Sequence, residues 1–353
     1  MEILDVFNQN AFGVISLSAA ISDMTPQFGY LESLNLFPEE GVTQRTVAVD
    51  FDVTNNQLLP QSQWGGPAPA NKSAKGKTRS YAIPHFPVED QMLAADLQGR
   101  RRPGTDMTVD MQYVLSKKMR EMRLKIEQTK EWLRLGVLKS GQIKDGAGNL
   151  ILDIYADFGI SQDSTSFVLG TTTTDVLGKI ATVKRQAVKA LRGSPMSYFL
   201  ALCSDSFYDD LVSHPNVQKA FQYFQNGNGY SLDVDLSFGA TKPDAEARFT
   251  PPTSVFKFGG VGWINYSGTV PDSTGAAQAL IDDGSAYMFP MGTDAFKTWH
   301  APADYMETVN TMGLPFYAKQ ERTKYDKGID VECQSNPLPI CLKPKVIQKC
   351  TVA

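Results

Sequence analysis

The longest periodic segment of the chain, residues 105–136, constrains the fold more than any other feature. Its apolar positions recur at steps of three, four or small multiples of these, which predicts one face of an amphipathic helix. These positions are Met107, Met111, Leu115, Met119, Met122, Ile126 and Leu133. Thr105 is the expected N-cap, Asp106 and Asp110 suit the helix N-terminus, and Gly136 is the expected stop. At 1.5 Å per residue, some thirty residues give a rod of about 45 Å, long enough for a structural strut. The Met stripe is also compatible with a cofactor pocket or a promiscuous groove, but core packing is the commoner use of this spacing.

An extended arm precedes the rod. Residues 47–53 alternate apolar and polar side chains, which predicts a strand with one solvated face. Residues 80–88 form a second extended segment, in which Pro84 and Pro87 predict an edge position. The Gly-, Pro- and Lys-rich loop between them exceeds twenty residues, a length usually found in functional or mobile loops. Residues 46–88 therefore predict a hairpin-like arm that reaches from the rod toward a neighbouring copy.

The remainder of the chain predicts a mixed α+β lobe with a final pair of strands. Asp145-Gly146, between two extended runs, is a strong hairpin signal. An amphipathic helix is expected from 174 to 193, with an apolar side made of Leu177, Ile180, Ala187, Val188 and Leu191. A buried strand, two helices divided at His214-Pro215, and strands around a Gly-Gly turn at 259–260 follow. The lobe spans about 175–325, and the tail adds two strands around a Pro-rich turn.

Charge is distributed unevenly, although the formal net charge is only -4. Residues 1–53 hold eight acids and one base, Arg45, whereas bases predominate in residues 100–144. Two interpretations stay open. The charges form two solvated faces by chance, or an acidic N-terminal arm meets a basic helix in its own subunit or in the next one.

No catalytic, metal or cofactor site is predicted. Gly76-Lys77-Thr78 resembles the end of a phosphate-binding loop, but position 71 is Asn71 and no helix follows directly. The three histidines are scattered, the four cysteines fit no zinc spacing, and Asp282-Asp283 indicates a turn. No apolar run is long enough to span a membrane, and the acidic N-terminus predicts an unexported protein with reduced thiols.

The order of these elements resembles that of tailed-phage major capsid proteins with the Hong Kong 97 fold. Several segments are similar, more narrowly, to the lambda-type capsid protein E family. They are the arginine cluster Gln98 to Arg102, the long helix, the segment Gly141 to Asp157, the stretch Val255 to Gly268 that ends in Tyr266-Ser267-Gly268, and the close Asp330 to Ala353 with its turn at Ser335 to Cys341. The likeness spans most of the chain and is weakest in 195–250, and the ordered set rather than one motif carries it.

The resemblance implies an α+β fold with an N-terminal arm at 1–45, an E-loop hairpin at 46–88, and a peripheral domain at 89–165 with a spine helix at 105–136. It further implies an axial domain at 166–327 and closing strands of the peripheral domain at 328–353. The implied function is structural: hexamers and pentamers form an icosahedral phage head around double-stranded DNA. The implied partners are further copies of the chain, a scaffold, a portal, packaged DNA and, in some relatives, a decoration protein. The implied location is the virion, after assembly in the host cytoplasm, with no membrane and no cofactor.

Contacts between subunits are expected at the arm and at the charged segments. On the arm, Trp64 with Gly65 and Gly66 is expected to insert against an adjacent subunit. The cations expected to contact neighbours on the arm are Lys72, Lys75, Lys77 and Arg79. Arg100, Arg101 and Arg102 are expected to pair with acids of a neighbouring N-terminal arm, such as Glu39 or Glu40, or to contact packaged DNA.

Two alternatives stay open. One is an encapsulin-like shell of the same fold that holds protein cargo. The other is a cytoplasmic enzyme that uses His300, Asp304 and Tyr305.

Overall fold

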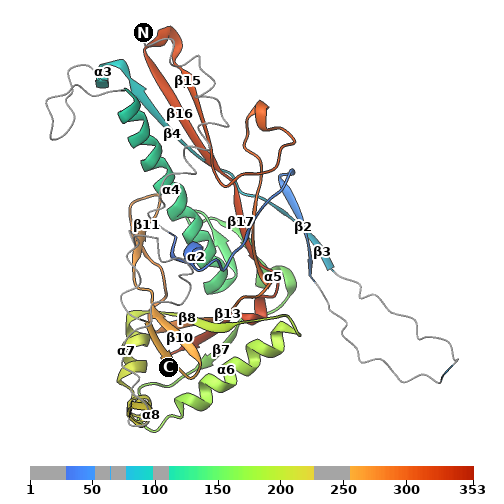
Figure 1. The fold of residues 1–353 in the computed structure, drawn as a ribbon, viewed down its shortest axis with the longest axis vertical. Coiled ribbons are helices and arrows are strands. Elements are labelled where there is room, and N and C mark those ends of the chain that lie inside the picture. The colour runs from blue at the N-terminus through green and yellow to red at the C-terminus, as the bar shows by residue number, and fades with distance from the viewer. Residues whose placement is uncertain (1–28, 52–63, 65–76, 98–110, 226–254) are drawn as a thin grey trace.

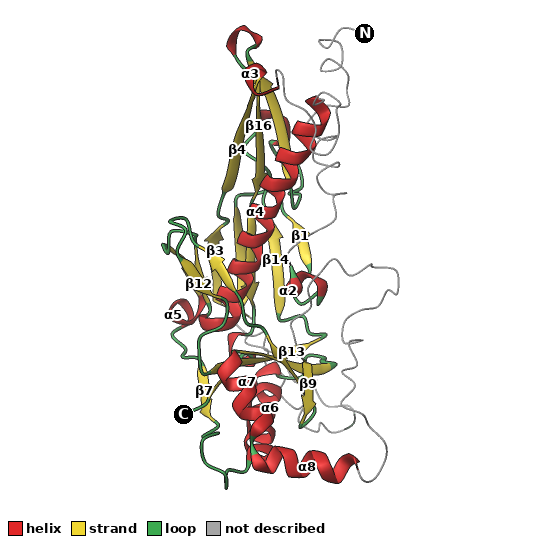
Figure 2. Ribbon diagram, turned by 90° about the vertical axis from the view of Figure 1, so that its left-hand side faces the viewer, coloured by secondary structure: helices red, strands yellow, loops and turns green. Residues whose placement is uncertain are grey.

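The structure is a computed structural model that describes residues 29–51, 64, 77–97, 111–225 and 255–353. These residues form an elongated molecule, in which helix α4 (Met111–Ser140) runs from one end toward the middle (Figure 1). A three-stranded sheet lies beside the first half of α4, and a lobe with a six-stranded sheet occupies the opposite end (Figure 2). The α+β class expected from the sequence is confirmed.

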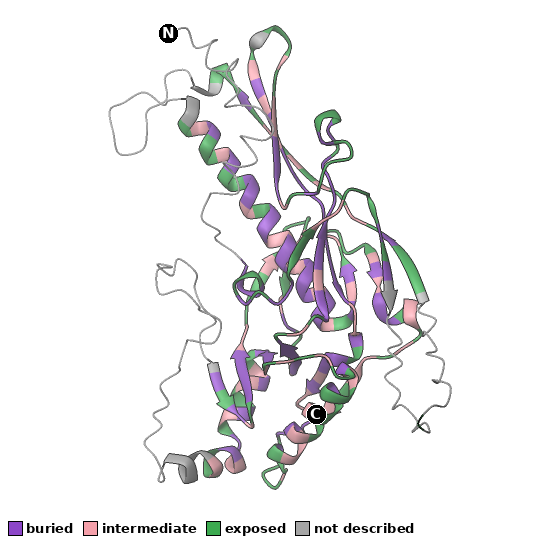
Figure 3. Ribbon diagram, turned by 45° about the vertical axis from the view of Figure 1, so that its right-hand side comes forward, coloured by how far each residue is buried: buried purple, intermediate pink, exposed green. Residues whose placement is uncertain are grey.

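Helix α4 packs its predicted apolar face into the core. Leu115, Met119, Met122 and Ile126 are buried against the antiparallel sheet of β15 (Tyr317–Arg322), β16 (Gly328–Ser335) and β4 (Phe86–Leu93). Leu133 joins a larger central core. Burial increases along the helix, so that its C-terminal half is buried on most sides (Figure 3). The core role expected of the methionines is thus confirmed for Met119 and Met122. The expected helix start, Thr105 to Asp110, lies outside the described residues.

The helix ends four residues later than the sequence predicted, at Ser140 rather than Gly136. A Cβ at Gly136 would lie 2.4 Å from the carbonyl oxygen of Gln142. Gly136 therefore permits the close approach of the following strand rather than ending the helix. The stop is Gly141, whose φ of +64° is a left-handed conformation that glycine adopts without strain.

The predicted arm begins as an antiparallel ribbon of β2 (Thr46–Phe51) and β3 (Lys77–Ala82). Val47 and Val49 are buried, as their alternation predicted, and Tyr81 joins them in the central core. The second extended segment divides after β3, because β4 leaves the ribbon and pairs with β16. Pro87 lies in β4, an edge strand of its sheet, as expected.

The predicted Asp-Gly hairpin is confirmed as β5 (Gln142–Lys144) and β6 (Leu150–Asp153). The Asp145 carboxylate accepts hydrogen bonds from the backbone N–H groups of Ala147 and Asn149, which fixes the turn. The second extended run is shorter than expected. It becomes helix α5 (Ile154–Phe158) because Asp153 accepts a hydrogen bond from the Ala156 N–H and caps it.

The described part of the N-terminal segment lies on the rest of the fold. Helix α2 (Tyr30–Ser33) and strand β1 (Glu39–Gly41) run beside the lower half of α4. Strand β1 pairs in parallel with β14 (Phe296–His300), which pairs with β17 (Pro337–Cys341). Leu31, Leu34, Leu36 and Phe37 are buried in the central core.

The lobe is built on a six-stranded sheet in the order β7-β18-β13-β8-β10-β9. Its strands are β7 (Asp163–Ser166), β18 (Gln348–Thr351), β13 (Ser285–Met291), β8 (Tyr198–Cys203), β10 (Val261–Asn265) and β9 (Val255–Phe258). Helices α6 (Val176–Leu191), α7 (Asp205–Ser213) and α8 (Pro215–Gln225) pack on one face of this sheet. The expected buried strand, the division at His214-Pro215 and the Gly-Gly turn are confirmed. The tail holds three strands rather than the expected two, and β16, β17 and β18 each enter a different sheet.

Short elements complete the fold. They are α3 (Ala94–Leu97), the hairpin of β11 (Thr269–Pro271) and β12 (Ala277–Ala279), and the 3-10 turns η3 (Met306–Thr308), η4 (Lys324–Asp326) and η5 (Pro344–Val346). No helix in the described part of the chain is long and apolar enough to cross a membrane.

The predicted apolar face of α6 is partly wrong. Ile180, Ala187 and Leu191 are buried, but the side chains of Leu177 and Val188 are 45% and 49% exposed. At about 100° per residue, Leu177 and Val188 lie roughly 100° around the helix from the buried stripe. Helix α6 therefore has two apolar stripes, and the sheet covers one of them.

Candidate assembly surfaces

An ionic cluster joins the N-terminal segment to helix α4 within one subunit. Oε1 of Glu39 lies 2.8 Å from Nζ of Lys130 and 2.7 Å from a guanidinium nitrogen of Arg134. Glu32 lies 3.3 Å from Arg134. The Lys130 and Arg134 side chains are only 2% exposed. The acidic segment and the basic helix therefore do meet in their own subunit, which was one of the two forms of that hypothesis.

Two titratable groups in this cluster have shifted pKa values. Burial by itself would raise the pKa of Glu39, but a hydrogen bond with His300 and the charge of Lys130 hold it well below its usual range. His300 is 1% exposed, and its Nε2 lies 3.3 Å from Oε2 of Glu39. Burial lowers the pKa of His300, against the raising effect of Glu39. The imidazole is therefore neutral at pH 7, and Glu39 is ionised.

A second buried acid, Glu131, ties three segments together. Its Oε1 accepts hydrogen bonds from the backbone N–H of Leu31 at 3.0 Å and from the Tyr266 hydroxyl at 2.8 Å. The Tyr266 ring stacks on Tyr30 at 5.4 Å. Burial raises the pKa of the Glu131 carboxyl, although both hydrogen bonds oppose that shift. Helix α2, helix α4 and the end of β10 are thus joined at one carboxylate.

Sequence reasoning missed this cluster for an identifiable reason. The predicted apolar stripe of the helix leaves Arg123, Lys130 and Arg134 on its other faces, where solvent exposure is expected, but all three are buried. Cations on the faces beside an apolar stripe usually face solvent. The acids that compensate Lys130 and Arg134 are Glu32 and Glu39, about a hundred positions away, which no local pattern indicates. Tyr266 was noted only as part of a sequence resemblance.

The expected contact residues lie on different parts of the molecule. Trp64 is fully exposed, and Glu40 is exposed, with its carboxylate 3.5 Å from Lys297. Arg79 lies 3.8 Å from Asp157 and over the Phe158 ring, so it has contacts within its own subunit. Lys77 lies in β3. Outside the described residues lie Gly65, Gly66, Lys72, Lys75, Arg100, Arg101 and Arg102.

The structure offers no support for an enzyme site at His300, Asp304 and Tyr305. His300 lies beside Glu39 in the core, whereas the exposed Asp304 carboxylate is 2.5 Å from Arg45. Tyr305 is buried, with the Lys319 ammonium over its ring. These contacts give each of the three a separate structural setting.

The described residues likewise give no support for a metal site or a phosphate-binding site. Among the residues described, no group of three or more His, Cys, Asp or Glu side chains is placed to hold a metal ion. Lys77 and Thr78 lie in a strand that pairs with β2, so they do not open a helix as a phosphate-binding loop requires. The four cysteines are free and buried, and burial raises the pKa of Cys333 and Cys341 to about 12. They are unreactive thiols.

Comparison with known proteins gives one consistent result. Residues 13–352 match the family model described as Phage major capsid protein E. The major capsid protein of Pseudomonas phage KPP10 is 26% identical over 97% of this chain and 97% of its own length. That of Salmonella phage Felix O1 is 24% identical over 96% of each. A solved structure assigned to a capsid protein of a prophage of E. coli CFT073 has the same fold, with a TM-score of 0.51 and 15% identity over 95% of each chain.

Proposed function

Because this chain belongs to the phage major capsid protein E family, it is a structural protein that assembles with itself into a virion capsid, and we propose that it does so as hexamers and pentamers. Rings form when one surface of a subunit meets a different surface of the next and the rotation closes. The two ring sizes together close an icosahedral head. The proposed content of the head is double-stranded DNA.

The observation that carries this proposal is the projecting ribbon of β2 and β3 (Figure 1). A two-stranded ribbon is only marginally stable alone in water, and its edges offer unpaired backbone groups. Trp64, in the segment that joins the two strands, is fully exposed. An exposed Trp beyond a ribbon supports insertion against an adjacent subunit, where main-chain pairing supplies affinity with few demands on side chains.

The segments of the chain are proposed to have different roles in assembly. Residues 1–45 act as an N-terminal arm and 46–88 as an E-loop. Residues 89–165 and 328–353 form a peripheral domain around the spine helix, and 166–327 form an axial domain around the capsomer axis. The packing of α4 on β4 and β16 supports a rigid peripheral unit.

Of the two acids expected to pair with arginines of a neighbouring subunit, only one remains available for that contact. Glu39 is already occupied by Lys130 and Arg134, so Glu40 is the better acid for Arg100, Arg101 and Arg102 of a neighbour. Exposed pairs contribute only about 0–1 kcal/mol each, so repetition over many interfaces must supply their effect. Packaged DNA is the competing partner of these arginines. Charge reversal at all three that left assembly unchanged at low salt would remove this pairing.

The further proposed partners are a scaffold, a portal and a decoration protein, with assembly in the host cytoplasm. No feature of the described residues favours a cargo-filled shell or an enzyme.

Removal of the arm tests the proposal. A full chain in which a short Gly-Ser turn replaces residues 57–77 should remain folded but form no closed particles in electron microscopy. A matched variant replaces the same residues with a Gly-Ser loop of equal length, which keeps the reach but removes Trp64, Lys72 and Lys75. It should form fewer particles than the unmodified chain. Normal particles from the shortened chain would contradict the proposed role of the arm.

A further inference from the structure

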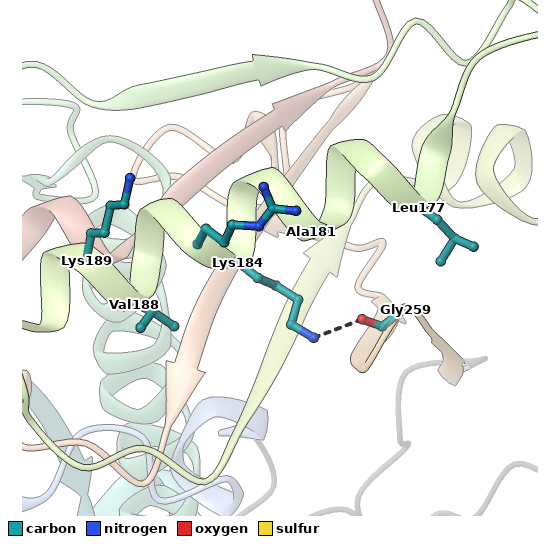
Figure 4. A pocket seen from close by; sticks show the side chains of 7 residues that line it. Leu177, Ala181, Lys184, Val188, Lys189 and Gly259 are labelled. Carbon is teal, nitrogen blue, oxygen red and sulfur yellow. Dashed lines mark hydrogen bonds between the residues drawn. The ribbon is translucent and has the colours of Figure 1, made fainter.

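The groove on the outer face of α6 is the strongest unassigned surface of the described chain. It has a volume of about 690 Å³ and is lined by Leu177, Ala181, Lys184, Arg185, Val188, Lys189 and Gly259 (Figure 4). The Lys184 ammonium donates a hydrogen bond to the Gly259 carbonyl oxygen at 3.0 Å, which lays its aliphatic stem along the groove. The exposed apolar stripe of Leu177, Ala181 and Val188 is therefore continuous across one side of the helix.

A helix that has apolar stripes on two sides is usually buried on both sides. The inner stripe of α6 packs in the core of the lobe. The outer stripe has no cover within the described chain, so a partner is the natural means of removing it from water.

A basic stripe borders the apolar one. Helix α6 contains four cations and no acid over Val176–Leu191. The ammonium of Lys179 donates to the Ser166 carbonyl oxygen, but Arg185 and Lys189 are exposed at i and i+4. Like charges at this spacing repel each other. The partner that fits must therefore be acidic beside an apolar patch.

Helix α7 of the same chain has such an acidic stripe beside apolar side chains. Asp205 and Asp209 are exposed at i and i+4. Tyr208 and Val212 are half-buried along the adjacent side. In both helices the order around the axis is buried stripe, apolar stripe, then charged stripe. Two such helices in antiparallel contact place apolar against apolar and acid against base.

The positions of the two helices exclude a contact within one subunit. Helix α7 lies along one edge of the lobe, and α6 runs beneath the sheet toward the other side (Figure 1). Both pack their inner faces on the same side of the sheet. Their outer faces can meet only between copies, as a heterologous contact of the kind from which rings are built.

We propose that the α6 groove receives helix α7 of a second copy of this chain, with Arg185 and Lys189 facing Asp205 and Asp209. This contact deepens the proposed assembly function and rests on it. It names the surfaces through which neighbouring lobes join within one capsomer.

Reciprocal charge reversal tests the contact on the full chain. The variant Arg185→Glu/Lys189→Glu should raise the protein concentration needed for assembly about tenfold, measured by sedimentation velocity and electron microscopy. Adding Asp209→Lys to the same chain should restore much of the assembly, because every copy then carries reversed charge on both faces, while Asp205, which accepts a hydrogen bond from Asn265, is left in place. Gln186→Glu, on the exposed side of α6 away from the groove, is the control and should have little effect.

A cross-link supplies an independent measurement. Because the four native cysteines are buried, the variant Val188→Cys/Val212→Cys should give intermolecular ladders up to the ring size with a short bismaleimide reagent. The single variants should give at most dimers.

Each outcome decides the proposal. Assembly that is lost and not restored by the reciprocal variant, or a lower unfolding midpoint of the subunit, would show that this face packs within its own subunit and would overturn it. Unchanged assembly of the first variant would also overturn it. If the unmodified chain formed no rings or particles, the proposed assembly function itself would fail.

Discussion

Oε1 of Glu39 lies 2.7 Å from a guanidinium nitrogen of Arg134, and this ion pair joins strand β1 to helix α4 across 95 positions of sequence. It fixes the N-terminal segment on the spine helix of the same subunit. A subunit that enters a shell with this segment already docked presents a defined surface to its neighbours.

Arg134→Met should destabilise the subunit by about 3 kcal/mol, because removing one partner of a buried pair leaves charge without full compensation. Denaturant unfolding of the unassembled subunit measures this. Lys117→Met is the matched control, since Lys117 is 65% exposed beside Glu121 and such pairs contribute about 0.3–0.5 kcal/mol. Equal effects of the two variants would mean that the cluster has no special role.

The lowered pKa of buried His300 predicts that the protein loses stability on mild acidification. Its folded pKa is lowered by burial, so the unfolded chain binds more protons as pH falls through about 6.5. The stability of the native chain should therefore fall below about pH 6.5, with a slope of at most about 1.4 kcal/mol per pH unit. His300→Asn should lack this contribution. If both chains showed the same pH dependence between pH 7 and 5, His300 would not be the sensor.

The raised pKa of Glu131 predicts a pH dependence of stability opposite to that of His300. Burial raises its folded pKa, so ionisation of this carboxyl increasingly opposes folding as pH rises above the unfolded value of about 4.3. Glu131→Gln keeps an acceptor for Leu31 and Tyr266 but cannot ionise. The stability of this variant relative to the native chain should rise with pH. Glu131→Leu is the control: it also cannot ionise, but it should be less stable than the Gln variant, because the Leu31 N–H loses its partner. A pH-independent difference between the Gln variant and the native chain would contradict the shifted pKa.

Gly136→Ala should destabilise the fold although alanine favours helices. The gain in helix propensity is about 1 kcal/mol. The new Cβ would lie 2.4 Å from the Gln142 carbonyl oxygen, and overpacking of this kind costs about 1–3 kcal/mol. Thermal unfolding should therefore shift to lower temperature. Gly170→Ala, where a Cβ meets nothing within 4 Å, should leave the midpoint nearly unchanged.

Trp64→Ala should separate assembly from folding. The side chain is fully exposed in the subunit, so the free energy of unfolding should change by less than about 0.5 kcal/mol. Assembly should weaken, because a Trp at the centre of an interface is a common hot spot. Particle yield at matched protein concentration measures this. Full assembly of the variant would place Trp64 outside the contacts between subunits.

Local patterns in the sequence predicted most elements of the fold. The period of α4, the alternation of Val47 and Val49 and the Asp145-Gly146 turn are each set by neighbours within a few positions. The errors fell where a contact with a distant segment decided the outcome. Gly136 continues the helix because a following strand needs its missing Cβ. The exposed stripe of Leu177 and Val188 cannot be distinguished by composition from the buried stripe of the same helix.

Sequence alone therefore determined the long rod, several of the strands, the order of segments and, through their resemblance, the family of this chain. Those properties depend on backbone preference and hydrophobic periodicity, which act over short separations. Only the tertiary structure decided which charges are buried, that Glu39 pairs with Lys130 and Arg134 of its own subunit, and that α6 has an apolar face that no described residue covers. The physical reason is that desolvation and ion pairing depend on what the fold brings within a few ångströms, and residues 39 and 134 meet only after the chain has folded.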